Sequence, residues 1–395
     1  MLGVAIFLIA VNLRPAVASV GPVLTDIRDG LHLSSVELSL LTSLPVVCFG
    51  LLAPLGPWLS QRIGLIRAIG CFIAVIAIGL VVRIGPDAGT LFTGTLVIAA
   101  GIAAANVLIP ALIKREFPHR TGAMMGVYTL AVTGSAAFAA GLTVPLQHAI
   151  GGGWRDGLGV WAILAVIAIV VWAPQLGVDP EAKAEPFALR GLLRDKVAWM
   201  VTLYFGLQSL SFYAVLTWLP TLFEDHGLSE GHAGALLSLS TAVQTPAALV
   251  VPALALRMRT TTPLVVGSVA LTALGFAPLL AFPMAAPYLW VIILGIGQGA
   301  AFPIGLTLFV LRSRTSAITQ HLSAMAQGIG YLIAALGPFM IGIFHALTGG
   351  WSLSFAVLLV LLVPQALFGV AASKPAFAGD RASLPSGRER TLPTA

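Results

Sequence analysis

Long apolar stretches, separated by short groups of charged residues, glycine and proline, run along most of this 395-residue chain. A helix needs about 17 to 25 largely apolar residues to cross the roughly 30 Å hydrocarbon core of a bilayer. Twelve stretches fit that range approximately, so the pattern predicts an all-α membrane protein with twelve transmembrane helices. The predicted spans are 2–24, 36–57, 67–84, 88–113, 121–147, 157–175, 197–220, 231–256, 262–282, 285–311, 316–345 and 351–372.

The composition agrees with this interpretation. Hydrophobic residues make up 58% of the chain and charged residues 9%, against about 25% in an average soluble domain. Cys48 and Cys71 both fall in apolar spans, so we expect no stabilising disulfide. The first apolar stretch has no basic segment before it, and eleven spans follow it. We therefore expect a retained helix instead of a cleaved signal peptide, and the native N-terminus could extend beyond Met1.

The distribution of basic residues predicts the orientation. Lys and Arg concentrate in the cytoplasmic loops of membrane proteins, and 17 of the 21 here fall on one side if both termini are cytoplasmic. Arg28, Arg83 and Arg155 fall in loops on the opposite side, and Arg14 falls inside the first span. The net charge of +6 therefore reflects topology and implies no nucleic-acid partner. We expect a multi-pass protein of the bacterial inner membrane with both termini in the cytoplasm.

Three landmarks recur 197 residues apart, which indicates a duplicated chain of six plus six helices. They are Gly30-Leu31 with Gly227-Leu228, Arg62 with Arg259, and Gly152-Gly153-Trp154 with Gly349-Gly350-Trp351. We expect two pseudo-symmetric six-helix bundles over 1–175 and 197–373, joined by a cytoplasmic linker at 176–196 and followed by a disordered cytoplasmic tail at 374–395. Trp154 and Trp351 are expected to be membrane-interface anchors.

Arg14 is the one charged side chain that we expect to be buried in a span, about 20 Å of helix from Met1 and with no acidic residue at similar depth. A charge at the bilayer centre costs about 2.5 to 3.5 kcal/mol on insertion scales and marks a candidate functional site. Its planar guanidinium suits a carboxylate, a nitro group or similar paired oxygens. The alternative is a structural arginine that bonds to backbone carbonyls of neighbouring helices.

Polar residues at helical spacing extend this candidate site. In the seventh span Tyr204, Gln208, Ser211 and Phe212 form one face, Tyr213 follows them, and the 197-residue offset places Ser211 opposite Arg14. The eleventh span carries Gln320, Ser323, Gln327 and Tyr331. Asn106, Tyr128 and Gln298 are single polar groups at similar depth. Each of the three could instead form an interhelical hydrogen bond.

His321 could titrate near neutral pH and couple transport to protons. It lies only about 10 Å into its helix, so a packing or interfacial role is the alternative. The sequence contains no nucleotide-binding loop and no metal-ligand spacing, and no carboxylate falls within a span. We therefore expect neither an enzyme nor an ATP-driven pump, and no cofactor or metal.

Several motifs resemble those of the major facilitator superfamily. Residues 61–67 are similar to its signature between the second and third helices, with Gln61 where an acid is usual. More specific similarity to the branch of cyanate and nitroimidazole transporters (CynX/NimT) comes from Asn12-Leu13-Arg14-Pro15-Ala16, Ser211-Phe212-Tyr213-Ala214, Trp218-Leu219-Pro220, Phe302-Pro303-Ile304-Gly305-Leu306 and residues 322–331.

The residues and the resemblance together predict a secondary or facilitative transporter that works by alternating access. We expect it to act as a monomer and to bind a small anionic or nitro-bearing solute, such as cyanate, a nitroimidazole or a small carboxylate, with Arg14 as anchor. Phe212 and Tyr213 would wall the pocket, and Gln208, Gln327 and Tyr331 would donate hydrogen bonds. The alternatives are a multidrug efflux transporter of the same fold and a membrane sensor that moves no solute.

Overall fold

The computed structural model describes residues 2–177 and 189–380, whose regular secondary structure is helical. Most of the predicted linker and tail lies outside these residues. Eleven helical stretches in the described part are long and apolar enough to cross a membrane. The pair formed by α4 and α5, bent by 50° after Leu52, makes a twelfth if it counts as one span. The predicted all-α fold class is confirmed.

The first half contains ten α-helices and two 3-10 turns. They are α1 (Leu2–Asn12), α2 (Pro15–Ala18), η1 (Gly21–Val23), α3 (Leu24–Leu31), α4 (Ser35–Leu52), α5 (Leu55–Ile63), α6 (Leu65–Val82), α7 (Ala88–Glu116), α8 (Thr121–Ile150), α9 (Trp154–Gly159), α10 (Ala162–Trp172) and η2 (Ala173–Gly177). The second half contains α11 (Leu189–Leu192), α12 (Lys196–Asp225), α13 (Glu230–Ala242), α14 (Gln244–Arg257), α15 (Thr262–Ala281), α16 (Pro287–Leu311), α17 (Ser316–Thr348) and α18 (Ser352–Ala372).

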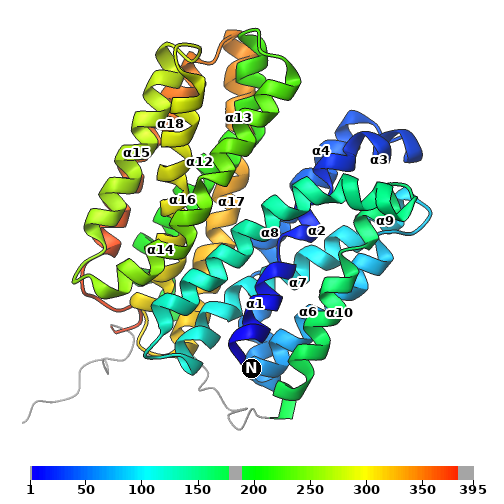
Figure 1. Ribbon diagram of the computed structural model, residues 1–395. Coiled ribbons are helices and arrows are strands. Elements are labelled where there is room, and N and C mark those ends of the chain that lie inside the picture. The colour runs from blue at the N-terminus through cyan, green and yellow to red at the C-terminus, as the bar shows by residue number, and fades with distance from the viewer. Residues whose placement is uncertain (1, 178–188, 381–395) are drawn as a thin grey trace, which may run out of the picture.

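Two helical bundles stand side by side in Figure 1, with α1–α10 in one and α12–α18 in the other. The end of the molecule that carries the N-terminus, η2 and α11 is called the linker side, and the end that carries α3 and the turn between α17 and α18 is called the far side. The bundles meet toward the linker side and diverge toward the far side (Figure 1).

Polar contacts join the two bundles on the linker side. The Lys114 ammonium of α7 donates to the carbonyl oxygen of Val310 (2.9 Å), in the last turn of α16, and to that of Ser313, two residues after the helix ends. The Ser316 hydroxyl donates to the Ala111 carbonyl over 3.0 Å. Because backbone carbonyls at a helix C-terminus lack partners and carry partial negative charge, the lysine stabilises this contact.

Glycines allow the bundles to approach closely in the same region. A Cβ atom added to Gly126 of α8 would lie 2.4 Å from the Leu249 carbonyl oxygen of α14. One added to Gly50 of α4 would lie 3.0 Å from the Gly328 carbonyl oxygen of α17. Any side chain at Gly126 would therefore push α8 and α14 apart.

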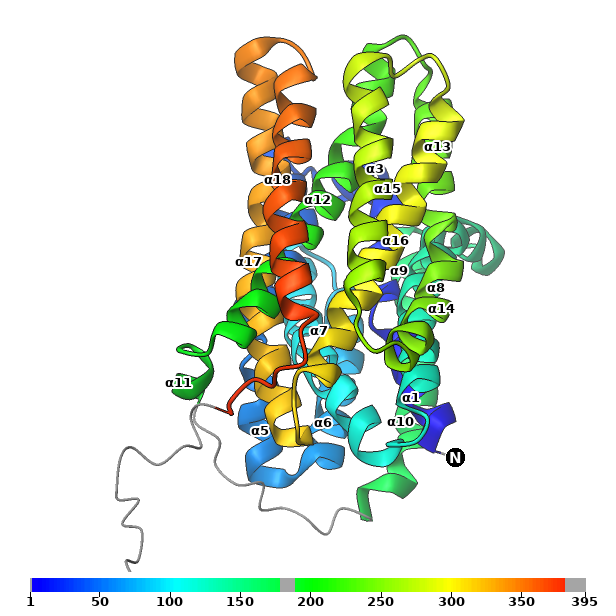
Figure 2. The ribbon, with the colours of Figure 1, turned by 90° about the vertical axis from the view of Figure 1, so that its left-hand side faces the viewer.

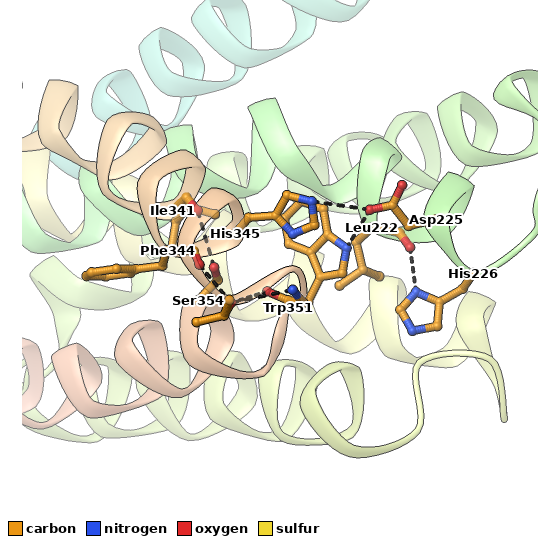
Figure 3. Close-up of polar contacts among 10 residues, drawn as sticks. Leu222, Asp225, His226, Ile341, Phe344, His345, Trp351 and Ser354 are labelled. Atoms are coloured by element: carbon orange, nitrogen blue, oxygen red, sulfur yellow. Dashed lines mark hydrogen bonds and ion pairs between the residues drawn. The ribbon is translucent and has the colours of Figure 1, made fainter.

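Trp351 fixes the far side of the second bundle. Its indole Nε1 donates to the Asp225 carboxylate over 2.9 Å, and its ring stacks on the His345 imidazole with centroids 4.1 Å apart (Figure 3). The His345 Nε2 lies 3.6 Å from the same carboxylate. At the equivalent place in the first bundle, Trp154 packs over Gly30, where a Cβ would lie 2.8 Å from the indole nitrogen. Each tryptophan thus contacts the last turn of another helix of its own bundle, α12 for Trp351 and α3 for Trp154.

A C-terminal strap, residues 373–380, crosses the linker side of the second bundle (Figure 2). The Arg312 guanidinium donates to a strap carbonyl over 2.5 Å, and the Asp195 carboxylate accepts a strap amide over 3.0 Å. Arg314 makes two hydrogen bonds to Asp380, at 2.8 and 2.9 Å, and holds the pKa of that carboxyl below its ordinary value. The start of the predicted tail is therefore packed, and residues 381–395 lie outside the described part.

Candidate functional site

A break in the first helix presents Arg14. Helix α1 ends at Asn12 and α2 begins at Pro15, which has no N–H with which to continue the helical hydrogen bonds. Arg14 is the N-cap residue of α2, and its side chain caps none of the free amides. The Asn12 amide donates to the Leu8 carbonyl (2.7 Å) and to the Leu164 carbonyl of α10 (3.1 Å), which fixes the end of α1 to the bundle.

The Arg14 guanidinium lies between the two bundles. The phenol groups of Tyr213 on α12 and Tyr331 on α17 interact with it, and its Cζ is 5.9 Å from the ring centroid of Phe49 and 6.0 Å from that of Phe302. These distances are at the outer limit for cation–π attraction. Three of the four aromatic residues come from the second bundle, so a solute beside Arg14 would contact both bundles. These five residues are called the Arg14 site.

Aromatic rings continue outward from Tyr331. Its ring centroid is 5.5 Å from that of Phe49, 5.4 Å from that of Phe205 and 6.4 Å from that of Tyr213. The predicted Phe212 packs edge-on against Tyr213 at 5.4 Å. Phe49, Phe205 and Phe302 were not predicted from the sequence as site residues. Phe49 and Phe205 sit in apolar spans without a distinguishing neighbour, whereas Phe302 precedes Pro303 in a motif that could have marked it.

Three further predicted residues form a hydrogen-bonded group close to this site. The Tyr128 hydroxyl donates to the Asn106 side-chain oxygen over 3.1 Å, and the Gln327 amide donates to the Asn106 carbonyl over 3.2 Å and to Ser323 over 2.8 Å. Tyr128 is also within electrostatic range of Arg14 and Tyr331. The side-chain amide nitrogen of Asn106 is buried and has no hydrogen-bond partner among the residues that the structure describes. This group therefore retains a donor for an additional acceptor.

The other predicted polar residues lie within the second bundle. Gln298 donates to Ser211 over 3.1 Å, and its buried side-chain oxygen has no hydrogen-bond partner in the described part of the chain. Gln208 donates to Ser209 over 2.6 Å. Tyr204 is fully buried, and its hydroxyl donates to the Ala301 carbonyl over 3.2 Å. These contacts are interhelical or local, and the structure does not bring Tyr204 or Gln208 into contact with Arg14.

His321 lies between the bundles on the linker side, away from the Arg14 site. Its Nε2 is 2.9 Å from the Gln61 side-chain nitrogen, and its Nδ1 is 2.8 Å from the Ala317 carbonyl oxygen. If Nδ1 carries the proton and donates to that carbonyl, Nε2 accepts from Gln61. A glutamine at position 61 therefore joins the two bundles through a neutral hydrogen bond where an acid is usual in the similar family motif.

Arg14 was the one charged side chain expected to be buried in a span, and the structure buries another arginine, Arg83, more deeply. Arg83, expected in a loop, is 0% exposed, whereas Arg14 is only partly buried. Arg83 follows α6 directly, and its side chain folds back into the first bundle, where three oxygen atoms accept its hydrogen bonds. A position at the end of a span says nothing about which way a long side chain turns, so hydropathy could not reveal this burial.

Two pockets lie away from Arg14. One, of about 680 Å³, includes Arg62, Arg67 and Trp172 of the first bundle, and the other, of about 500 Å³, lies beside Asp225 and Trp351 of the second. Neither includes residues of both bundles, as a pathway between the bundles requires. Within residues 2–177 and 189–380, no three His, Cys, Asp or Glu side chains are arranged to hold a metal ion.

Comparison with known proteins agrees with this architecture. The family model of the Major Facilitator Superfamily matches residues 2–338. The chain is 34% identical to the 2-nitroimidazole transporter of Escherichia coli (strain K12), covering 93% of this chain and 94% of that protein. It is also 34% identical to the cyanate transport protein CynX of the same organism, over 88% of this chain and 91% of the other.

The fold agrees as well. The solved structure of the proton:xylose symporter XylE, with 6-bromo-6-deoxy-D-glucose bound, superposes with a TM-score of 0.76 at 14% identity, covering 96% of this chain and 98% of that one. Identity this low supports the fold alone. The family model and the two relatives confirm the resemblance drawn from residues 12–16 and 61–67. The chain belongs to the major facilitator superfamily of membrane transporters.

Proposed function

We propose that this transporter moves a small anionic or nitro-bearing solute across the bacterial inner membrane, with Arg14 as the anchor for its oxygen atoms. One observation carries the proposal. The guanidinium of the first bundle faces Tyr213 and Tyr331 of the second, and among residues 2–177 and 189–380 no carboxylate interacts with it. A cation in that position is electrostatically uncompensated until a solute supplies negative charge.

The chemistry of the site favours a planar, oxygen-bearing solute. A guanidinium presents its N–H donors in a flat fork that matches the two oxygens of a carboxylate or nitro group. Phe49 and Phe302 offer ring faces against which a flat solute can pack, and the phenols of Tyr213 and Tyr331 can donate further hydrogen bonds. That two relatives are named for 2-nitroimidazole and cyanate supports the same solute class.

The contacts between the bundles support an assignment of the facing state. Lys114, Ser316 and His321 all make their inter-bundle hydrogen bonds on the linker side. With the linker and both termini in the cytoplasm, as the basic loops favour, this is an outward-facing state in which the Arg14 site communicates with the far side. Reversal would break these contacts and close the far side. In this proposal the monomer is the working unit.

His321 is the titratable group best placed to link protons to this change. Protonation puts a hydrogen on both imidazole nitrogens, so the Gln61 amide could no longer donate to Nε2 and would have to rotate. Importing an anion against an inside-negative potential costs about 2.3 kcal/mol per 100 mV, and proton co-transport would offset that cost. We propose this as the coupling route, separate from solute binding at Arg14.

Binding of 2-nitroimidazole, cyanate and benzoate to purified protein, measured by calorimetry, tests the anchor. Replacing Arg14 by Gln removes a charged hydrogen-bond donor worth about 1.5 to 3 kcal/mol, so we expect affinity for the solutes that bind to fall at least about tenfold. Arg14→Lys keeps the charge but loses the forked pair of donors, so it should recover only part of the lost affinity. Arg155→Gln on the far side is the control.

Arg155 also donates to backbone carbonyls, those of Gly85 and Pro86, but lies away from the Arg14 site. Equal affinity in the wild type and Arg14→Gln would refute the anchor role. Flux of the same solutes into liposomes must be lost in the same variant. Binding without flux in the wild type would contradict the assignment of transport for these solutes.

A further inference from the structure

Arg83 is a fully buried arginine of the first bundle, and two of its three contacts lie just beyond Arg14 in the chain. Its Nη1 donates to the Ala16 carbonyl, and its Nη2 donates to the Ser19 hydroxyl and to the Leu158 carbonyl, both over 3.3 Å. Ala16 belongs to α2, Ser19 is its C-cap residue, and Leu158 belongs to α9. Arg83 therefore joins three elements of the first bundle around the short helix that follows the break.

Burial of the Arg83 guanidinium costs free energy that its contacts must offset. A buried charge is costly unless its hydrogen bonds are well satisfied, and a well-packed apolar side chain of similar volume is often no less stable. Within residues 2–177 and 189–380, no carboxylate accepts a hydrogen bond from Arg83, and its Nε has no hydrogen-bond partner. The arginine is nonetheless aimed at the backbone of α2, which indicates that fixing this segment is its role.

The break is held on both sides of Arg14. Two residues before it, Asn12 donates to the Leu164 carbonyl of α10, and two residues after it, Ala16 accepts from Arg83. Helix α2 has only four residues and cannot fix its own direction. The glycine at position 94 of α7 leaves room for this arrangement, because a Cβ there would lie 2.3 Å from the Arg83 Cβ.

The internal duplication indicates whether a buried arginine at this position serves every six-helix bundle or only the first. The 197-residue offset places Leu280 where the first half has Arg83, and Ser211 where it has Arg14. A device needed only to close a six-helix bundle would be expected in both halves. The two arginines instead occur together, in the half whose first helix is broken beside the candidate anchor.

We propose that Arg83 is a positioning residue that holds the break between α1 and α2, so that the Arg14 guanidinium points into the space between the bundles. This inference deepens the proposed function and rests on Arg14 as the solute anchor. Arg83 does not touch the solute. It acts through the backbone of residues 14–19, and its loss should loosen that segment and weaken binding only where Arg14 is present.

Hydrogen exchange of the solute-free protein in detergent tests whether Arg83 holds this segment, without reference to transport. Arg83→Lys keeps a positive charge but cannot satisfy three acceptors at once, and Ser19→Ala removes one acceptor. We expect both to raise amide exchange at residues 16–20 by about tenfold or more, while Arg155→Lys leaves it unchanged. Unaltered exchange in Arg83→Lys would overturn the inference whatever the role of Arg14.

Binding of 2-nitroimidazole and benzoate in a double-mutant cycle then tests the positioning. We expect Arg83→Lys to weaken binding about tenfold or more in the presence of Arg14, and to have no further effect in Arg14→Gln, because a displaced anchor matters only while the anchor exists. An equal loss in both backgrounds would mean general damage and would overturn the inference. Normal binding by Arg14→Gln alone would instead exclude Arg14 as the solute anchor. The exchange experiment would still show whether Arg83 holds residues 16–20.

Discussion

Replacement of Gly126 by Ala is the sharpest test of the contact between the bundles. A Cβ at this position would lie 2.4 Å from the Leu249 carbonyl oxygen, whereas ordinary contacts begin at 3.4 Å. The obstacle is backbone, so no side-chain rotation relieves it, and α8 and α14 must separate by about 1 Å. Overpacking of this kind costs about 1 to 3 kcal/mol. The cost applies only while the linker side is closed.

A penalty confined to one state shifts the equilibrium between states. About 1 to 3 kcal/mol corresponds to a shift of roughly 5- to 150-fold away from the state with a closed linker side. Spin labels at Arg120 and Arg257, on the exposed linker-side ends of α8 and α14, report the change after Cys48 and Cys71 are replaced by Ser. We expect the longer label-to-label distance to gain population in Gly126→Ala.

Gly134→Ala is the matched control on the same helix. A Cβ there meets none of the described residues within 4 Å, yet the substitution changes the helix propensity of α8 in the same way. It should leave the distance distribution as in the wild type. If Gly126→Ala and Gly134→Ala gave the same distribution, the close approach of α8 to α14 would not control the facing state, and the reasoning would be refuted.

Two further predictions concern the linker side. Lys114→Met removes the hydrogen bonds to the end of α16, worth about 1 to 3 kcal/mol in total, so the same label pair should also show more of the longer distance, and an unchanged distribution would contradict it. Arg314 lowers the pKa of Asp380, so the contact with the strap is present at neutral pH and lost as pH falls through that lowered pKa. A spin label at Ala376 should therefore become more mobile in acid, and Asp380→Asn should reproduce that mobility at pH 7, whereas a label that stays immobile in Asp380→Asn would exclude this role of the ion pair.

Much of the fold could be predicted because the bilayer requires each membrane-spanning segment to be a long apolar helix, whatever its tertiary contacts. The isolated charge at Arg14 was informative for the same reason, since a cation in an apolar span must find polar surroundings. Tyr213 and Tyr331 were also predicted, and the structure places both beside it. Gln327 and Tyr331 share a face of α17, and both contact residues of the first bundle.

The rest depends on rotations and close contacts that the sequence does not record. Tyr204 shares a helical face with Ser211 in the pattern, but α12 packs against α16 and α18 as well, and the phenol turns to the Ala301 carbonyl. Phe49 is one apolar residue among many in its span, and only the meeting of two bundles makes it a neighbour of Arg14. Arg83 was assigned to a loop because hydropathy places residues by depth, not by direction.

The unequal halves have a consequence for how a solute would travel. The second half carries Ser211 where the first carries Arg14, so the positive charge of the Arg14 site belongs to the first bundle. An anion bound to Arg14 would stay with the first bundle through the whole transport cycle, while the aromatic residues of the second bundle move relative to it. Arg14 would remain the strongest electrostatic partner of the anion from binding to release. Release of the anion would therefore depend on movement of the uncharged second-bundle residues and on entry of water.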